Sequence, residues 1–123
     1  MSVLTAFTTQ LVNFFEELIN TFPEERDIKL ALEALKGAKK INPRLILDLY
    51  YEHVHKDLAP AIAKRDVNII RNAAQIKIST QFNEMISALA IFDRHWDSMG
   101  PSNQEVIWKY LQVLSLLCEK ARA

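Results

Sequence analysis

Apolar residues recur every three or four positions along most of the chain, which is the spacing of one face of an α-helix. The first stripe begins at Leu4 and ends at Phe22, where Pro23 stops the helix. Its members are Leu4, Phe7, Leu11, Phe14, Phe15, Leu18 and Phe22. Val12 and Ile19 add apolar side chains off this stripe. A helix that is apolar nearly all round is expected to be central in the fold or covered by a partner.

Two further helices are expected in the next part of the chain. One spans about residues 24–36 and ends at Gly37, or it continues through Gly37 at a cost of about 1 kcal/mol. The other begins at Asn42-Pro43, because Asn caps a helix and Pro favours its first turn. Its stripe comprises Ile46, Leu49, Tyr50, Val54 and Leu58. This helix is expected to bend or end before Pro60.

A short helix is expected near residues 60–65, followed by a cap or turn at 66–68. A long helix is then predicted over about residues 76–99. Its stripe comprises Ile78, Phe82, Met85, Ile86, Leu89, Phe92 and Trp96. No segment shows the alternation of apolar and polar residues that is typical of a β-strand. The pattern therefore predicts an all-α fold, a compact bundle of four to five helices in a single domain over residues 1–123.

The last helix follows a Gly-Pro pair at 100–101, which is expected to end the preceding helix sharply. Ser102 and Glu105 have the spacing of a capping box. The inward-facing residues are predicted to be Val106, Ile107, Tyr110, Leu111, Leu114, Leu117 and Cys118. Val113 and Leu116 add apolar side chains outside this stripe, so a partner is one way to cover this helix.

Composition is that of a globular protein, with 50% hydrophobic and 24% charged residues among 123, and the formal net charge is zero. A protein that binds nucleic acid by bulk charge would be basic. Residues 36–77, however, hold nine basic and four acidic residues. Candidate contacts to nucleic acid or an acidic partner are Lys36, Lys39, Lys40, Arg44, Lys64, Arg65 and Arg71. The alternative, a solvated face balanced by the acidic N-terminal helices, is favoured.

Signals for export and membrane insertion are not expected. The N-terminal region has no cationic segment, and Glu16 and Glu17 interrupt its apolar residues. No apolar run approaches the roughly 20 residues that a membrane span needs. The one cysteine, Cys118, fits a reducing compartment and is expected to be a small core residue. These features predict an intracellular protein that is not secreted by a signal peptide.

Catalytic and metal-binding patterns are weak. Glu52 and His55 form a single Glu-x-x-His pair, whereas di-iron bundles use that pair twice, so a surface ion pair is favoured. Asp93, His95 and Asp97 alternate along a helix, which scatters them around it. We therefore expect no catalytic residue, no metal ligand and no cofactor.

Large aromatic side chains are the candidates for protein contact, because Trp and Tyr concentrate at binding hot spots. Trp96 and Trp108 lie near the two ends of the Gly-Pro corner, and Tyr51 adjoins Tyr50, of which at most one can face the core. Packing between the last two helices is the alternative for both tryptophans. It is favoured for Trp108, and Trp96 is left open.

Three stretches carry a resemblance to a known group: FFEELINTFPEE at 14–25, Asn-Pro-Arg at 42–44 and IWKYLQ at 107–112. In this order and spacing they resemble short hypothetical proteins of nucleocytoplasmic large DNA viruses, of the phycodnavirus kind. The resemblance extends over about residues 11–117, and the segment 67–70 departs from it. It brings no activity or catalytic residues. It implies a viral origin and a setting in the virion, the virus factory or the host cytoplasm.

Together these features predict a non-enzymatic helical protein-interaction module that binds another protein or a second copy of itself through an apolar helical face. In the viral setting, it would be a minor virion component or an assembly-associated protein. The alternative is a nucleic-acid-associated protein that uses the basic region 36–77.

Overall fold

Every regular element is helical in a computed structural model, which describes residues 2–80 and 84–123. This confirms the predicted all-α class, although the chain forms more and shorter segments than the expected four to five. No helix within the described ranges is long and apolar enough to cross a membrane. The elements are α1 (Val3–Thr21), α2 (Arg26–Ile41), α3 (Pro43–Tyr50), the π-helix η1 (Tyr51–His55), α4 (Lys56–Lys64), α5 (Val67–Thr80), α6 (Glu84–Ser87), α7 (Ala90–Arg94), the 3-10 helix η2 (Trp96–Ser98) and α8 (Pro101–Arg122).

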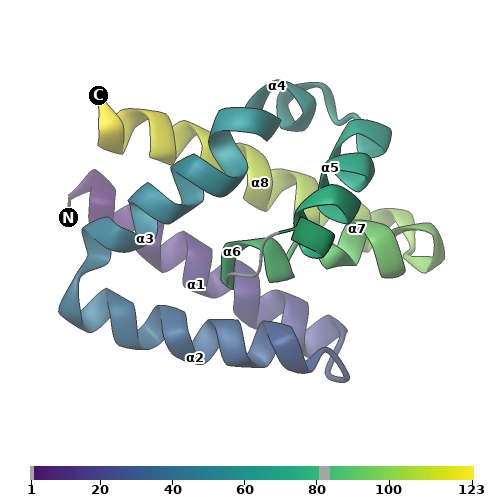
Figure 1. The fold of residues 1–123 in the computed structure, drawn as a ribbon, viewed down its shortest axis with the longest axis horizontal. Coiled ribbons are helices and arrows are strands. Elements are labelled where there is room, and N and C mark those ends of the chain that lie inside the picture. Colours follow the sequence, from purple (N-terminus) through teal and green to yellow (C-terminus); the bar gives the residue numbers. More distant parts are fainter. Residues whose placement is uncertain (1, 81–83) are drawn as a thin grey trace.

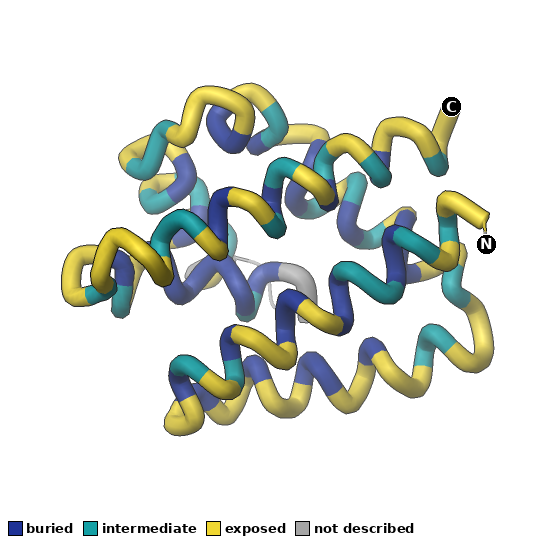
Figure 2. Tube along the Cα trace, turned by 180° about the vertical axis from the view of Figure 1, so that it is seen from behind, coloured by how far each residue is buried: buried dark blue, intermediate teal, exposed yellow. Residues whose placement is uncertain are grey.

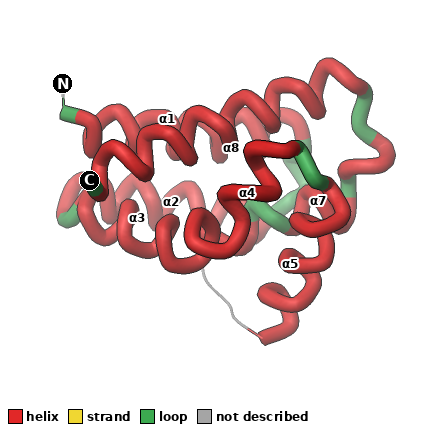
Figure 3. The backbone as a smooth tube through the Cα atoms, turned by 90° about the horizontal axis from the view of Figure 1, so that it is seen from above, coloured by secondary structure: helices red, strands yellow, loops and turns green. Residues whose placement is uncertain are grey.

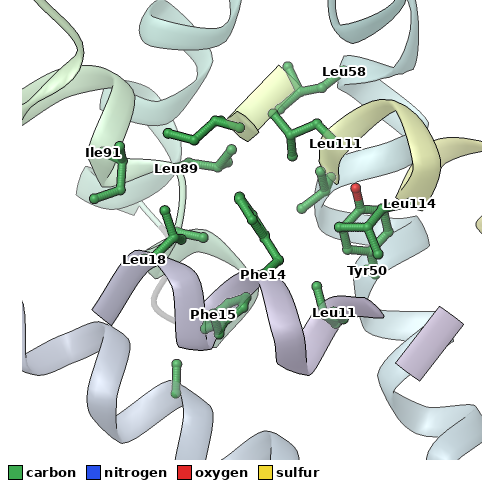
Figure 4. Packing of buried hydrophobic residues seen from close by; sticks show 14 of the residues in the cluster. Leu11, Phe14, Phe15, Leu18, Tyr50, Leu58, Leu89, Ile91, Leu111 and Leu114 are labelled. Carbon is green, nitrogen blue, oxygen red and sulfur yellow. The ribbon is translucent and has the colours of Figure 1, made fainter. Parts of the chain in front are cut away.

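Helix α1 is the central element, as its nearly continuous apolar surface predicts. It contacts α2, α3 and α8, and it runs antiparallel to α8, so that both chain ends lie on the same side of the molecule (Figure 1). Its core residues point toward side chains of α8, α3 and the segment around residue 90 (Figure 4). Ser2 caps the helix by accepting from the Thr5 amide at 3.0 Å. It ends at Phe22, directly before Pro23, as expected.

One continuous helical run, α3–η1–α4, crosses the molecule. Asn42 caps it and Pro43 occupies its first position, as predicted. The run does not end before Pro60, which lies inside α4. Instead it inserts the π-turn at 51–55, where the Lys56 amide donates to the Tyr51 carbonyl five residues earlier. Pro60 therefore does not end the run, and a π-turn, which is a common site of helix bending, precedes it.

The turn expected at 66–68 begins one residue earlier, because Arg65 adopts a left-handed conformation with φ of 56°. The amides of Arg65 and Asp66 donate back to Ile62 and Ala61 at 3.2 and 2.8 Å, which closes α4 in a Schellman motif. Asp66 then caps α5 by accepting from the Ile69 amide at 3.2 Å.

The prediction of one long helix over residues 76–99 is wrong. Helix α5 begins at Val67, and the chain then forms the short segments α6, α7 and η2. Six of the seven residues from 86 to 92 are buried, whereas one face of a straight helix buries three or four in seven. Tight turns bury them all: the Leu89 amide donates to the Ile86 carbonyl at 2.9 Å. The predicted stripe residue Phe82 lies outside the described residues.

The capping box predicted at Ser102 and Glu105 is also absent. Helix α8 starts two positions earlier than that box requires, at Pro101, with Gly100 as its cap residue and no side-chain cap. Pro has no amide hydrogen to satisfy, so it suits the first helical position. Glu105 is instead paired with Arg65, with 2.7 Å between the guanidinium and the carboxylate.

Helix α2 takes the second of its two predicted forms and continues through Gly37 to Ile41. A Cβ atom at Gly37 would meet no atom within 4 Å. We therefore expect Gly37→Ala to raise the free energy of unfolding by about 1 kcal/mol, since alanine loses less backbone entropy in a helix. Urea unfolding followed by circular dichroism measures this change.

Gly100→Ala is the matched control for Gly37→Ala. Its Cβ would also meet open space, but Gly100 is the cap of α8, a position where glycine is preferred over alanine. This variant should be no more stable than the parent. Equal gains at both positions would contradict the assignment of Gly37 to a helix interior.

Candidate functional site

Both tryptophan candidates are buried. Trp96 is 7% and Trp108 is 5% exposed. The Trp96 ring stacks on Phe92 with 4.7 Å between centroids and meets the Trp108 ring edge-on at 5.3 Å. The structure therefore shows the packing alternative for both residues, including Trp96, which the sequence left open. The cluster joins α7, η2 and α8 inside the core, which confirms the packing favoured for Trp108 and leaves neither tryptophan exposed as an anchor for a partner.

Tyr51 is half-buried, and its ring is covered by its own chain. The Arg122 guanidinium lies 3.7 Å from the ring centroid, and the same side chain donates to Asp48 at 3.1 Å. The His55 ring stacks at 5.8 Å from the Tyr51 ring. Tyr51 thus ties the π-helix to the end of α8, and little of its ring is left for a partner.

Glu52 and His55 have different partners, so they form neither a metal-binding pair nor the favoured surface ion pair with each other. Glu52 is exposed and pairs with Lys56 at 3.4 Å, whereas His55 is buried with its Nε2 atom 3.4 Å from Glu119. The wide π-turn that contains both residues departs from the 3.6-residue period behind the i, i+3 rule. Nowhere in the described part of the chain are three His, Cys, Asp or Glu side chains placed to hold a metal ion.

The basic residues of region 36–77 do not form one patch. Arg44 lies at the start of α3 and Lys64 at the end of α4, which are the two ends of a continuous 22-residue run about 33 Å long. One group gathers at the α2–α3 corner: Lys36, Lys39, Lys40 and Arg44. A second group lies on the last turn of α4, the following turn and α5: Lys64, Arg65, Arg71 and Lys77.

Four of these eight cations pair with carboxylates. Arg44, Arg65, Arg71 and Lys77 pair with Asp48, Glu105, Asp97 and Asp57, at distances of 3.6, 2.7, 2.9 and 2.9 Å. Lys39 donates to the Thr9 hydroxyl at 3.2 Å. Among described residues, only three members of the two groups form no such contact: Lys36, Lys40 and Lys64. This arrangement matches a solvated face, but the carboxylates that balance it lie on α3, α4, η2 and α8 and not on the acidic N-terminal helices.

The most densely bonded polar cluster lies at the turn between α1 and α2. Glu25 is buried there and accepts from Arg94 at 3.2 and 2.6 Å, while Nε2 of His95 lies 2.7 Å from the carboxylate. Phe22 stacks on the His95 ring with 4.3 Å between centroids. Burial alone would raise the pKa of Glu25, but the hydrogen bonds and charges of Arg94 and His95 outweigh it and hold the pKa below its ordinary value.

Asp93, His95 and Asp97 are scattered, as their alternation predicts. His95 faces Glu25, whereas Asp93 accepts from Gln75 and Asp97 accepts from Arg71, both on α5. Each of these side chains holds one helix to another. The cluster is therefore a structural clamp.

Helix α8 carries two apolar stripes. The inner stripe is buried and comprises Ile107, Trp108, Leu111, Leu114 and Cys118. The outer stripe, which we name the outer seam, comprises Val106, Tyr110, Val113 and Leu117. Val106 and Val113 are 36% and 43% exposed, and the neighbouring Leu116 is 51% exposed. Figure 2 shows that buried and exposed positions alternate along α8.

Three outer-seam residues were predicted to face inward: Val106, Tyr110 and Leu117. The prediction is wrong for Val106, which is exposed, whereas Tyr110 and Leu117 are partly buried and pack against the edge of the core. The steps from 106 to 110, 113 and 117 are four, three and four, offset by one position from the inner set 107, 111, 114 and 118. Two offset series of this kind indicate two packing faces on one helix, and this signal is present in the sequence.

Helix α8 lies beside α1 (Figure 3). A shallow groove follows part of the outer seam, from Val106 to Val113. Its volume is about 280 Å³, and it is lined by Gln10, Val106, Lys109, Tyr110 and Val113. The Tyr110 ring packs on Phe14 at 5.3 Å. Burial raises the pKa of Tyr110, and the nearby carboxylates of Glu17 and Glu16 raise it further. The groove thus has an apolar floor, with Gln10 from α1 and Lys109 from α8 in its lining, and the carboxylates of Glu16 and Glu17 on α1 lie near Tyr110.

The chain matches no protein-family model, and comparisons with curated proteins and with solved structures give no match.

We expect Glu25→Gln to lower the free energy of unfolding by about 2 kcal/mol at neutral pH, because it removes the charge from a buried, hydrogen-bonded group. The folded-state pKa lies below the ordinary value of 4.5, so the carboxylate stabilises the fold above pH 4.5 and this contribution is lost as pH falls below it. The variant should therefore lose less stability than the parent on acidification. Urea unfolding at neutral pH and well below pH 4.5 tests both effects.

Glu24→Gln is the control for Glu25→Gln. Glu24 is exposed and lies 3.9 Å from the His95 ring nitrogen, so its loss should change stability by less than about 0.5 kcal/mol. Equal effects of the two substitutions would contradict the clamp.

Cys118 is expected to resist thiol reagents in the folded protein. It is fully buried, and burial raises its pKa to about 11, with Arg122 opposing and Glu119 adding to that shift. Two pKa units leave about 100-fold less thiolate, so labelling at mildly alkaline pH should be at least about 100-fold slower than in urea. A Cys118→Ser, Ser102→Cys variant, with an exposed thiol, should label quickly when folded. Equal rates for folded and unfolded parent protein would contradict the buried placement.

Proposed function

We propose that this protein is a non-enzymatic helical protein-interaction module, and that the outer seam with the adjacent edge of α1 is its binding surface. The observation that carries the proposal is the second apolar stripe on α8, which lies along a groove of about 280 Å³. A helix needs one stripe to pack on its own core, and a second stripe is typical of a helix that also packs on a partner.

The groove defines the chemistry of the partner. An amphipathic helix that lies in a groove presents apolar residues at three- and four-residue spacing. Here those residues would contact Val106, Tyr110 and Val113. Glu16 and Glu17 lie on the α1 edge and form no ion pair with a described residue, so the partner helix should carry a Lys or Arg on that side.

The viral setting remains part of this proposal. The resemblance of segments 14–25, 42–44 and 107–112 to proteins of nucleocytoplasmic large DNA viruses supports it. In that setting the module would be a minor virion component or an assembly-associated protein, in the virus factory, the host cytoplasm or the virion.

A nucleic-acid-associated function has less support. Most basic residues of region 36–77 are paired with carboxylates, and the remaining ones lie at separate corners of the fold. A protein that tracks a phosphate backbone needs several unpaired cations along one surface.

Site-specific cross-linking tests the proposed surface. A photo-reactive amino acid at position 109, beside the groove, should form adducts with an amphipathic helical segment in extracts of cells that contain the protein. Val113→Glu should abolish these adducts, because it places a charge on the apolar floor. Mass spectrometry of the cross-linked peptide identifies the segment and its basic residue.

Leu30→Glu is the matched control for Val113→Glu. Leu30 is an exposed apolar residue on α2, away from the outer seam, so this variant should keep the adducts. Adducts that survive Val113→Glu, or that disappear equally in both variants, would contradict the proposed surface.

A further inference from the structure

We propose that the occupant of the outer seam is a second copy of this chain, with the two α8 helices antiparallel across a two-fold axis. The inference rests on the function proposed above and names the partner of the same surface. Three observations carry it: the symmetry of the outer seam, the charges at its ends and the arrangement of α1 beside α8.

The order of polar and apolar side chains along the outer seam is nearly the same from either end of α8. Extended by one step at each end, it becomes Asn103, Val106, Tyr110, Val113, Leu117 and Lys120. A two-fold axis between Tyr110 and Val113 places Tyr110 opposite Val113 of the second copy, and Val106 opposite Leu117. Polar residues then meet at both ends, where Asn103 faces Lys120. An isologous interface requires this kind of self-complementary surface.

The 3-4-3-4-3 steps of this series match the spacing at which helices interlock in a coiled coil. Tyr110 is the largest side chain of the series and lies next to the axis. Its ring already rests on Phe14 at 5.3 Å, so it is held in one orientation before a partner arrives. An aromatic residue fixed near the centre of an interface is a typical hot spot.

Charge complementarity fixes the direction of the pairing. Helix α1 runs antiparallel to α8, and Glu17 lines a small cavity together with Asn103 and Val106. In the antiparallel pairing Lys120 of the second copy faces Asn103, and it therefore approaches Glu17. Neither Glu17 nor Lys120 forms an ion pair with a described residue of its own chain. The two-fold axis creates this Glu17–Lys120 pair twice.

A parallel pairing of the two α8 helices lacks this match. It would place Lys120 beside Lys120 and Lys109 beside Lys109, and like charges at close range oppose association. The formal net charge of zero adds no general repulsion between copies.

Sedimentation equilibrium of the purified full chain tests the proposal. We expect a mass of twice 14.2 kDa for the parent and 14.2 kDa for Val113→Glu. Val113 is partly exposed and outside the inner stripe, so circular dichroism should show an unchanged fold for the variant. A parent protein that stays monomeric at about 100 µM, or a dimer that withstands Val113→Glu, would overturn the proposal.

A charge swap tests the pairing itself. Glu17→Lys and Lys120→Glu should each raise the dimer dissociation constant by about fivefold or more, since each places two like-charge contacts in the dimer. The double variant restores both pairs with reversed sign and should return to within about twofold of the parent. Failure of the double variant to recover would overturn the antiparallel arrangement.

Glu33→Lys and Lys40→Glu are the control swap. Both residues are exposed on α2, and neither forms an ion pair with a described residue, so these variants should leave the dissociation constant unchanged.

The cross-linking experiment separates the two proposals. If position 109 forms adducts with a different protein and the parent is monomeric, the second-copy inference alone is overturned. If the adducts persist in the Val113→Glu variant, the proposed binding surface is overturned.

Discussion

Burial of the wide apolar face of α1 is the constraint on which the rest of the fold depends. Phe7, Leu11, Phe15 and Leu18 are almost completely removed from solvent, and each such side chain stabilises the fold by about 1.5–3 kcal/mol only when another element covers it. No single neighbour can cover so wide a surface, so α2, α3 and α8 all contact α1. The apolar run at 86–92 is drawn into the same core and turns tightly, because a straight helix would leave half of it in water.

Residues about 70 positions later in the chain hold the turn that follows α1. Phe22 and Glu25 both engage His95, one by ring stacking and the other through its carboxylate. Neighbouring Asp93 and Asp97 reach Gln75 and Arg71 on α5. A segment with this density of charge would be a natural place to look for catalysis. Here the structure shows its charged side chains bound to other helices, which accounts for the charges by packing.

The sequence was most informative where local chemistry decides the outcome. Pro23, the Asn42-Pro43 pair and the Gly-Pro pair at 100–101 mark helix boundaries that the structure confirms, since each acts through its own backbone. It was least informative where distant contacts decide. The π-turn at 51–55 depends on how a helix fits across the core, and Glu105 pairs with Arg65 rather than capping α8. Of the seven apolar residues assigned to the inner face of α8, four are buried, Tyr110 and Leu117 lie at the edge of the core, and Val106 is exposed.

Isolated apolar residues are normal on protein surfaces, and Leu30, Ile41 and Ile69 are exposed on three different helices. The outer seam differs from them in its register. Its members follow one helix at coiled-coil spacing, and each precedes by one position a buried residue of the inner stripe. Tyr110 and Leu117 also pack against the edge of the core, whereas Val106 and Val113 are exposed. These two exposed positions could therefore change to suit a partner while the fold around α1 was preserved.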